Sequence, residues 1–230
     1  MIVETTIGRF EANKAEVEVL LHSLSSTATT DMEKVVCRAS VVLLVAHFEG
    51  YLKDLALEYV DQVDAMDYES QMLPFALRDL HVQPRIDEIS ATRDGQQKRK
   101  LLEKLHGSSV LFASGAKPSK GTLKSAVLAR RVTSARPDVI DQMFAYMGSL
   151  DKPCDGALDF ESVTTGELVT RNIRFSLEEV VQCRNDIAHG DAGRSPTRED
   201  ATSYSEFLLH FARRLHRAKS ALVSELEEKI

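Results

Sequence analysis

Residues 39–54, A-S-V-V-L-L-V-A-H-F-E-G-Y-L-K-D, contain the longest apolar run of the chain, which ends at Phe48. Only Ser40 and His47 interrupt this run. The run is far too short to span a membrane. A helix that is apolar nearly all round must be covered by protein on every side. The stretch therefore predicts that a helix over about residues 31–63 forms the buried centre of a helical bundle.

Helical spacing of apolar residues continues on both sides of this stretch, so the sequence predicts an all-α fold. The long helix is expected to begin at a capping box formed by Thr30 and Glu33. Between residues 149 and 172 no period is sustained, which predicts a loop region with room for a short strand pair. Further helices are predicted over residues 8–24, 72–81, 84–91, 96–106, 122–132, 137–147, 176–189 and 198–228.

The composition is that of an ordinary soluble globule: of the 230 residues, 43% are hydrophobic and 28% are charged. This length suits one well-buried domain, or one domain with a sizeable insertion. The cysteines Cys37, Cys154 and Cys183 are widely spaced and predict neither a disulfide framework nor a zinc site. Together with an N-terminus that lacks the pattern of a secretory signal, they predict a cytoplasmic protein that does not contact a membrane.

Charge is unevenly distributed along the chain, whose formal net charge is −6. From Arg93 to Arg136 there are eleven basic and two acidic residues, so this segment carries +9 and the remainder of the chain −15. Such asymmetry predicts a basic face for a polyanion or for an acidic partner. Few aromatic residues and no tryptophan argue against a protein that binds single strands by stacking.

A second stretch, residues 176–191, S-L-E-E-V-V-Q-C-R-N-D-I-A-H-G-D, predicts a helix with a charged residue on its apolar face. Ser176 and Glu179 form a capping-box pattern at its start, and Gly190 tolerates the left-handed conformation that ends a helix. Arg184 falls in the middle of the apolar stripe. A guanidinium is costly there unless it is paired or faces a polar cleft.

His189 follows five residues after Arg184, about 140° around an ideal helix, so the two side chains do not share a face. Asn185 and His189, four residues apart, do share one. The arginine and the histidine converge if the helix unwinds near Gly190, or if a second copy brings its own pair alongside. A guanidinium holds phosphate oxygens in a fork and an imidazole moves protons near neutral pH, so the pair suits work on a phosphodiester.

The pattern Arg184-Asn185-x-x-x-His189 resembles the R-x(4–6)-H motif of HEPN domains, in which a polar residue commonly follows the arginine. Residues 47–51, H-F-E-G-Y, are similar to the F-E-G-[FY] segment on a long earlier helix in one prokaryotic branch of these domains. With that segment included, the similarity spans most of residues 30–225.

The resemblance implies one HEPN-like helical bundle over residues 1–230, built on the long central helix, with a basic insertion at 93–136 and the loop region at 149–172. In active HEPN domains, two copies pack so that their motifs face each other and form one RNA-cleaving site without a metal or other cofactor. The chain is therefore expected to be a homodimeric endoribonuclease of the toxin or antiviral-defence type. A neutralising antitoxin or other regulatory partner is expected to keep it inactive.

By the same resemblance, His189 acts as general acid or base, Arg184 stabilises charge on the scissile phosphate, and Asn185 holds the histidine or the phosphate. Glu49, an acid just past a buried run, is predicted to face Arg184 or His189 and orient it, unless it pairs with a cation on another helix. His47 is interpreted as a histidine of the core or its boundary. The basic residues expected to dock flanking RNA phosphates are Lys98, Arg99, Lys100, Lys117, Lys120, Lys124, Arg130 and Arg131.

Two other interpretations remain open. In the first, a noncatalytic HEPN-like module uses the same polar pocket to bind a nucleotide or an acidic segment of a protein partner. In the second, Arg184 and His189 are purely structural: they close a helix end, where cations are favoured, and pair with buried carboxylates such as Glu49. Retention of both motif residues favours the enzyme, because inactive relatives usually lose one of them.

Overall fold

The apolar stretch forms the middle of a 35-residue helix, α2 (Thr30–Asp64), in the computed structural model of the protein. The spacing of its fully buried residues, three or four positions, is that of one helix face. α2 has the length and apolar composition of a membrane-spanning helix. One face of its middle is buried as predicted, but Val42 and Leu43 are only half-buried and Met32 and Val35 are exposed, so the predicted cover on every side is incomplete. The buried residues of this stretch include Cys37, Val41, Leu44, Val45 and Phe48.

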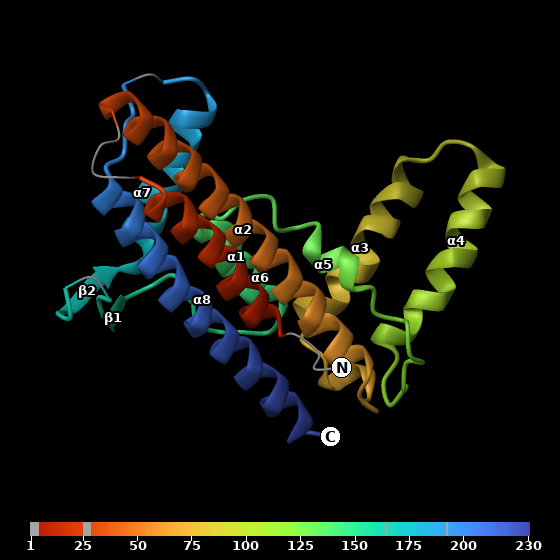
Figure 1. The fold of residues 1–230 in the computed structure, drawn as a ribbon. Coiled ribbons are helices and arrows are strands. Elements are labelled where there is room, and N and C mark those ends of the chain that lie inside the picture. The colour runs from red at the N-terminus through yellow and green to blue at the C-terminus, as the bar shows by residue number, and fades with distance from the viewer. Residues whose placement is uncertain (1–4, 25–28, 164, 192) are drawn as a thin grey trace. The chain divides into compact units, whose positions relative to one another are not determined.

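The structure describes residues 5–24, 29–163, 165–191 and 193–230, and within them the only sheet is a pair of short strands (Figure 1). The all-α fold class predicted from the sequence is thus confirmed. In chain order the elements are α1 (Thr6–His22), α2 (Thr30–Asp64), η1 (Ser70–Met72), α3 (Phe75–Ala91), α4 (Gly95–Ser109), η2 (Val110–Phe112), α5 (Ser125–Ala129), α6 (Pro137–Tyr146), β1 (Ala157–Glu161), β2 (Leu168–Asn172), α7 (Ile173–Ala188) and α8 (Arg198–Glu227).

The chain divides into two compact units. Because of this division, α2, α6 and α8 each contribute residues to both units. Unit 1 comprises Met1–Asp54, Val132–Ile140 and Pro153–Arg217, and unit 2 comprises Leu55–Arg131, Asp141–Lys152 and Ala218–Ile230.

An aromatic cluster forms the core of unit 1. The ring centroid of Phe48 in α2 lies 5.7 Å from that of Phe10 in α1 and 6.1 Å from that of Phe211 in α8. Phe48 also stacks on Tyr51 at 5.9 Å, and the Tyr51 hydroxyl donates a hydrogen bond of 2.7 Å to the carbonyl oxygen of Ala212. These contacts join the parts of α1, α2 and α8 that belong to unit 1, and the three helices run alongside one another in Figure 1.

The loop region predicted at 149–172 contains the strand pair, in which β1 and β2 are antiparallel and Ala157 lies opposite Asn172. Asn172 is both the last residue of β2 and the N-cap of α7. Its side-chain oxygen accepts a hydrogen bond of 3.0 Å from the backbone N–H of Phe175. The hairpin therefore leads directly into the helix that carries the R-x(4)-H motif.

Two helix starts differ from the prediction. α2 is capped by Thr29, whose hydroxyl accepts from the backbone N–H of Met32 at 3.3 Å, so the predicted start at Thr30 is one residue late. α7 begins at Ile173, about one turn before the predicted Ser176. In both helices a polar side chain does accept a hydrogen bond from the first turn, as predicted. The capping residues are Thr29 and Asn172, however, and not Thr30 and Ser176.

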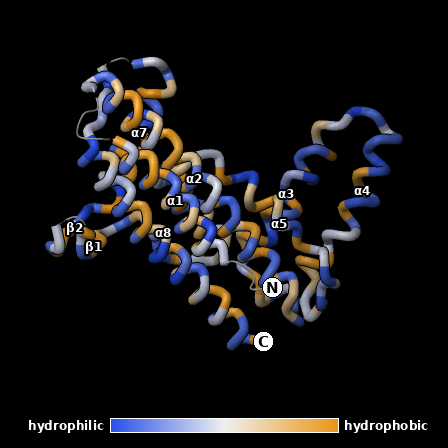
Figure 2. Tube along the Cα trace, viewed as in Figure 1, coloured by the Kyte–Doolittle hydropathy of each residue, from blue (hydrophilic) through white to orange (hydrophobic). Residues whose placement is uncertain are grey.

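In unit 2, α3 and α4 lie side by side as a helical hairpin (Figure 1). The sequence predicted two short helices, 72–81 and 84–91, on either side of a break at Pro84. This prediction is wrong, because Pro84 lies inside the single helix α3. The packing of buried residues on both sides of the proline, such as Leu80 and Ile89, outweighs the one hydrogen bond that it removes. α4 is mainly hydrophilic (Figure 2).

His81 of α3 forms a hydrogen bond with the backbone of Lys124, in the segment that follows α4. Its Nδ1 lies 2.8 Å from the carbonyl oxygen of Leu77 and donates to it, so Nε2 accepts from the backbone N–H of Lys124 at 3.0 Å. Burial lowers the pKa of His81 from its ordinary 6.5, and nearby Arg85 adds to this effect. The backbone carbonyls of Leu77 and Lys124 and the carboxylate of Asp64 oppose it. The imidazole is therefore neutral in the folded protein at neutral pH.

We predict that His81 makes the stability of the fold depend on pH below about 6.5. In that range the unfolded chain binds a proton at this histidine before the folded chain does. The free energy of unfolding therefore falls as the pH decreases from 6.5 towards the lowered pKa, and above 6.5 the contribution is constant. Denaturant unfolding at a series of pH values measures the slope. His81→Gln should flatten it, and substitution of the exposed His106 should not; equal slopes for wild type and His81→Gln would contradict the prediction.

Candidate functional site

α7 carries Arg184 and Asn185, and its apolar face anchors both in unit 1. The residues predicted to cap this helix have other roles. Ser176 is buried within the helix, and the Glu179 carboxylate accepts a hydrogen bond of 3.0 Å from the Tyr204 hydroxyl of α8. The buried positions along the apolar face include Ile173, Leu177, Val180, Val181 and Cys183.

The end of α7 is a tight turn that presents His189. The backbone N–H of Gly190 donates to the Ile187 carbonyl at 3.1 Å, and that of Asp191 donates to the Asp186 carbonyl at 2.9 Å. This pair of bonds is the Schellman pattern, which requires a residue with positive φ. Gly190 supplies it with a φ of 85°. His189 is the last residue before the turn, and its side chain is exposed.

We predict that Gly190→Ala lowers the free energy of unfolding by about 1 kcal/mol. No atom lies within 4 Å of a Cβ placed on Gly190, so the cost comes from the left-handed backbone alone. Gly50 is a matched control, because it also has nothing within 4 Å but lies inside α2. Alanine at Gly50 should stabilise the helix by about 0.5–1 kcal/mol. Denaturant unfolding measures both changes, and a stabilising Gly190→Ala would contradict the assigned turn.

Two oxygen atoms hold the guanidinium of Arg184. Its Nη2 lies 3.4 Å from Oε2 of Glu49 on α2, and its Nη1 donates to Oδ1 of Asn185 at 2.9 Å. The arginine side chain is 30% exposed and the glutamate side chain 19%. The cation in the apolar stripe is thus paired, and Glu49 contacts Arg184 as the sequence analysis expected. Part of the guanidinium nevertheless stays open to solvent.

Arg184 and His189 do not contact each other through a hydrogen bond in the described chain, and Asn185 directs its side-chain oxygen to Arg184. α7 remains helical as far as Ala188, and the chain leaves the helix at His189 and Gly190. The described residues contain no group of three His, Cys, Asp or Glu side chains placed to hold a metal ion.

Arg38 was not singled out by the sequence analysis, and it holds the segment that follows His189. Its Nη1 donates to the carbonyl oxygens of Asp191, at 2.8 Å, and Arg194, at 2.7 Å. Arg38 and Glu49 are eleven residues apart, so they lie on the same face of α2, about three turns from each other. This face positions both the guanidinium of Arg184 and the chain after His189. The helical spacing from Glu49 is the signal that could have identified Arg38.

His47 has a structural contact. Its Nε2 lies 3.6 Å from Oε2 of Glu16 on α1, and its side chain is 19% exposed. This position agrees with the interpretation of His47 as a boundary histidine.

The eight residues predicted to bind RNA all lie in unit 2, whereas the motif residues lie in unit 1. Lys98, Arg99 and Lys100 are exposed on α4. Lys117 forms an ion pair of 2.8 Å with Asp67. The basic segment is therefore not one uniform surface. Its remaining four predicted residues line a single pocket: Lys120, Lys124, Arg130 and Arg131.

The helical fold, the R-x(4)-H motif at the end of α7 and its pairing with the glutamate of the H-F-E-G-Y segment define a protein of the HEPN class. Comparison with family models agrees, because the model described as RiboL-PSP-HEPN matches residues 9–218. The chain therefore belongs to the RiboL-PSP-HEPN family, and the resemblance found in the sequence is confirmed. No curated protein and no solved structure matches the chain.

Proposed function

We propose that this protein is a metal-independent endoribonuclease. The observation that carries the proposal is the guanidinium of Arg184, which Glu49 and Asn185 hold in place while part of its surface stays open. His189 is exposed at the end of the same helix. A fixed cation and an accessible imidazole are the groups that phosphodiester transfer at neutral pH requires.

The proposed substrate is RNA, because the attacking group is the 2′-hydroxyl that DNA lacks. One His189 accepts the proton of the 2′-hydroxyl, and His189 of the second copy donates a proton to the departing 5′-oxygen. The bond from O2′ to phosphorus forms while the bond from phosphorus to O5′ breaks. The products are a 2′,3′-cyclic phosphate and a 5′-hydroxyl. Arg184 donates to the nonbridging oxygens and stabilises the five-coordinate phosphorus.

A second copy is part of this proposal because two proton transfers occur and each chain has one motif histidine. On an ideal helix, side chains with the spacing of Arg184 and His189 point about 140° apart. A two-fold dimer formed through the motif surfaces would bring the arginine of one copy beside the histidine of the other. We further propose that the dimer acts in the cytoplasm as a toxin or antiviral effector, and that a neutralising partner keeps it inactive.

Controlled expression of the wild type, Arg184→Ala and His189→Ala tests the proposal through growth and RNA integrity, followed by assays of purified protein with a chelator present. The wild type alone should arrest growth and yield RNA fragments with 2′,3′-cyclic phosphate ends. Intact RNA with the wild type would overturn the proposal and favour a binding module. Lower thermal stability of both variants, with unchanged activity per folded molecule, would assign the two residues a structural role.

A further inference from the structure

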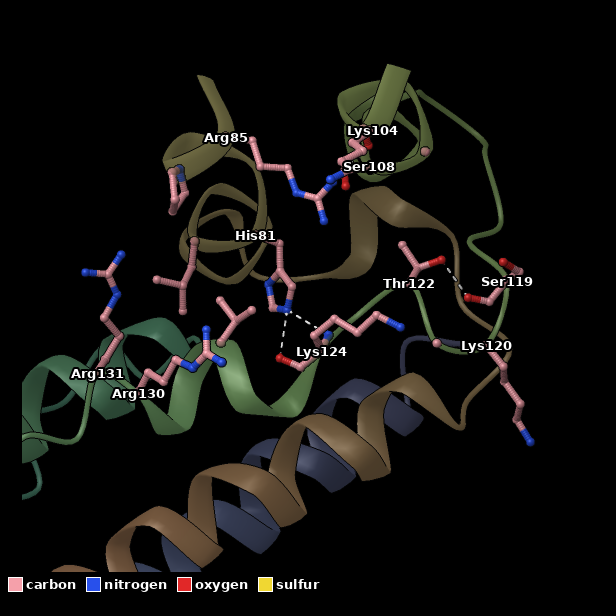
Figure 3. A pocket seen from close by; sticks show the side chains of 15 residues that line it. His81, Arg85, Lys104, Ser108, Ser119, Lys120, Thr122, Lys124, Arg130 and Arg131 are labelled. Carbon is pink, nitrogen blue, oxygen red and sulfur yellow. Dashed lines mark hydrogen bonds between the residues drawn. The ribbon is translucent and has the colours of Figure 1, made fainter. Parts of the chain in front are cut away.

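Unit 2 contains a pocket of about 520 Å³ that is formed by α3, α4 and residues 119–131 (Figure 3). Its volume is typical of a small-molecule site, for which about 300–1,000 Å³ is usual. No acidic side chain lines it. The cationic side chains that line it are Arg85, Lys104, Lys120, Lys124, Arg130 and Arg131.

These six cations have no carboxylate partner in the part of the chain that the structure describes. Arg85 donates to the backbone carbonyl of Lys104 at 2.9 Å, which leaves its other guanidinium N–H groups available. Like charges gathered around one hollow repel each other, and salt at physiological strength screens this repulsion over a length of about 8 Å. A bound polyanion would remove that repulsion and supply the missing acceptors.

The segment of the pocket wall around residues 121–124 is held by hydrogen bonds that do not use the cationic groups. The carboxylate of Asp64 accepts from the backbone N–H groups of Gly121 and Leu123, the latter at 2.9 Å. His81 accepts from the backbone N–H of Lys124 at 3.0 Å. The chain that carries several of the cations is thus fixed before any ligand arrives, which reduces the entropy lost on binding.

Figure 3 shows how the side chains lie around His81. Arg85, Thr122 and Lys124 border the space on one side of the imidazole, and Arg130 and Arg131 lie on the other side. Lys120 extends away from this space. Five of the six cations therefore lie around one open pocket, on more than one side of His81.

The rest of the lining fits a ligand that is more than a phosphate group. Leu80, Pro84 and Val127 provide apolar surface, and Ser108 and Ser119 provide hydroxyl groups. Phosphoryl oxygens suit the cations, sugar hydroxyls suit the serines, and a planar base suits the apolar wall. An RNA backbone, in contrast, spaces its charges along an extended groove.

We propose that this pocket binds a nucleoside di- or triphosphate, at a site separate from the RNA-cleaving motif. The proposal does not rest on the proposed ribonuclease activity, because every residue that carries it belongs to unit 2.

Calorimetric titration with ATP, AMP, inorganic triphosphate and a short single-stranded RNA tests the proposal, with a chelator present. The pocket variant is Lys124→Gln with Arg130→Gln, which changes two exposed side chains of the pocket lining. The matched control is Lys98→Gln with Arg99→Gln, which removes the same charge from α4 outside the pocket. ATP should bind once per chain, more tightly than AMP or inorganic triphosphate. The pocket variant should weaken it at least about tenfold, and the control about twofold or less.

The proposal would be overturned if ATP did not bind to the folded wild type, or if both double variants lost ATP affinity equally. It would also be overturned if the pocket bound RNA in place of ATP and the pocket variant alone lost that RNA binding. The last result would make the pocket an RNA dock. Equal affinity for ATP and inorganic triphosphate would overturn the nucleoside part of the assignment. His189→Ala should bind ATP as the wild type does, so failure of RNA cleavage and failure of this proposal are distinguishable.

Discussion

Arg184→Ala is expected to reduce the rate of RNA cleavage by about 10³-fold, because it removes the donors aimed at the charge that develops on phosphorus. Glu49 and Asn185 hold this guanidinium in the resting protein, so little reorganisation is needed when the phosphate arrives. Single-turnover cleavage of a labelled RNA measures the rate. Arg184→Lys keeps the charge but loses the fork that holds two oxygens, and should recover only part of the activity.

Arg213→Ala is the matched control for this prediction. Arg213 also lies in unit 1 and forms an ion pair with Glu11, with Nη2 2.7 Å from Oε1, but it is not part of the motif. Its loss should leave the cleavage rate unchanged. Full activity of folded Arg184→Ala, or an equal loss in Arg213→Ala, would contradict the role assigned to Arg184.

Phe48→Ala is expected to lower the free energy of unfolding by about 3–5 kcal/mol, which is the usual cost of deleting a buried aromatic ring. Phe48 is fully buried and contacts rings from two other helices through Phe10 and Phe211. Its removal leaves a cavity at the centre of the unit 1 core. Chemical denaturation monitored by circular dichroism measures the change.

The same deletion at an exposed position supplies the control. Phe175 is 68% exposed at the start of α7, so Phe175→Ala should change stability by no more than about 0.5 kcal/mol. If the two phenylalanine variants were equally stable, the aromatic cluster around Phe48 could not be the core of the unit.

The long helices could be predicted closely because their patterns extend over many turns. The expected ranges 31–63 and 198–228 agree with α2 and α8 to within one residue at each end. In such patterns a single misleading residue has little weight. The short elements are different: the start of α7 depends on Asn172, which becomes a cap because β1 and β2 bring the chain to that point.

The break expected at Pro84 shows the same limit. Proline disfavours a helix locally, but burial of neighbouring apolar residues decides the outcome, and this burial depends on residues distant in sequence. Local propensity therefore identified which segments are helical more reliably than where they begin or are interrupted.

At the motif, the contact between Glu49 and Arg184 could be anticipated because each charge is costly near apolar surface without the other. Arg38 was harder to anticipate, since its partners are backbone carbonyls that any residue carries and only its helical spacing from Glu49 pointed to it. The pocket of unit 2 could likewise not be predicted from the sequence. Its cations come from three separate segments that only the folded chain brings together, and Arg85 lies outside the basic segment defined from the sequence.

The most direct test of the central claim compares cleavage of one RNA by the purified wild type with cleavage of the same sequence carrying 2′-O-methyl groups, in the presence of a chelator. If Arg184 and His189 direct attack by the 2′-hydroxyl, the unmodified RNA will be cut to products with 2′,3′-cyclic phosphate ends and the methylated RNA will remain intact. Equal cleavage of both RNAs, or cleavage of the unmodified RNA by His189→Ala at the wild-type rate, would contradict the account.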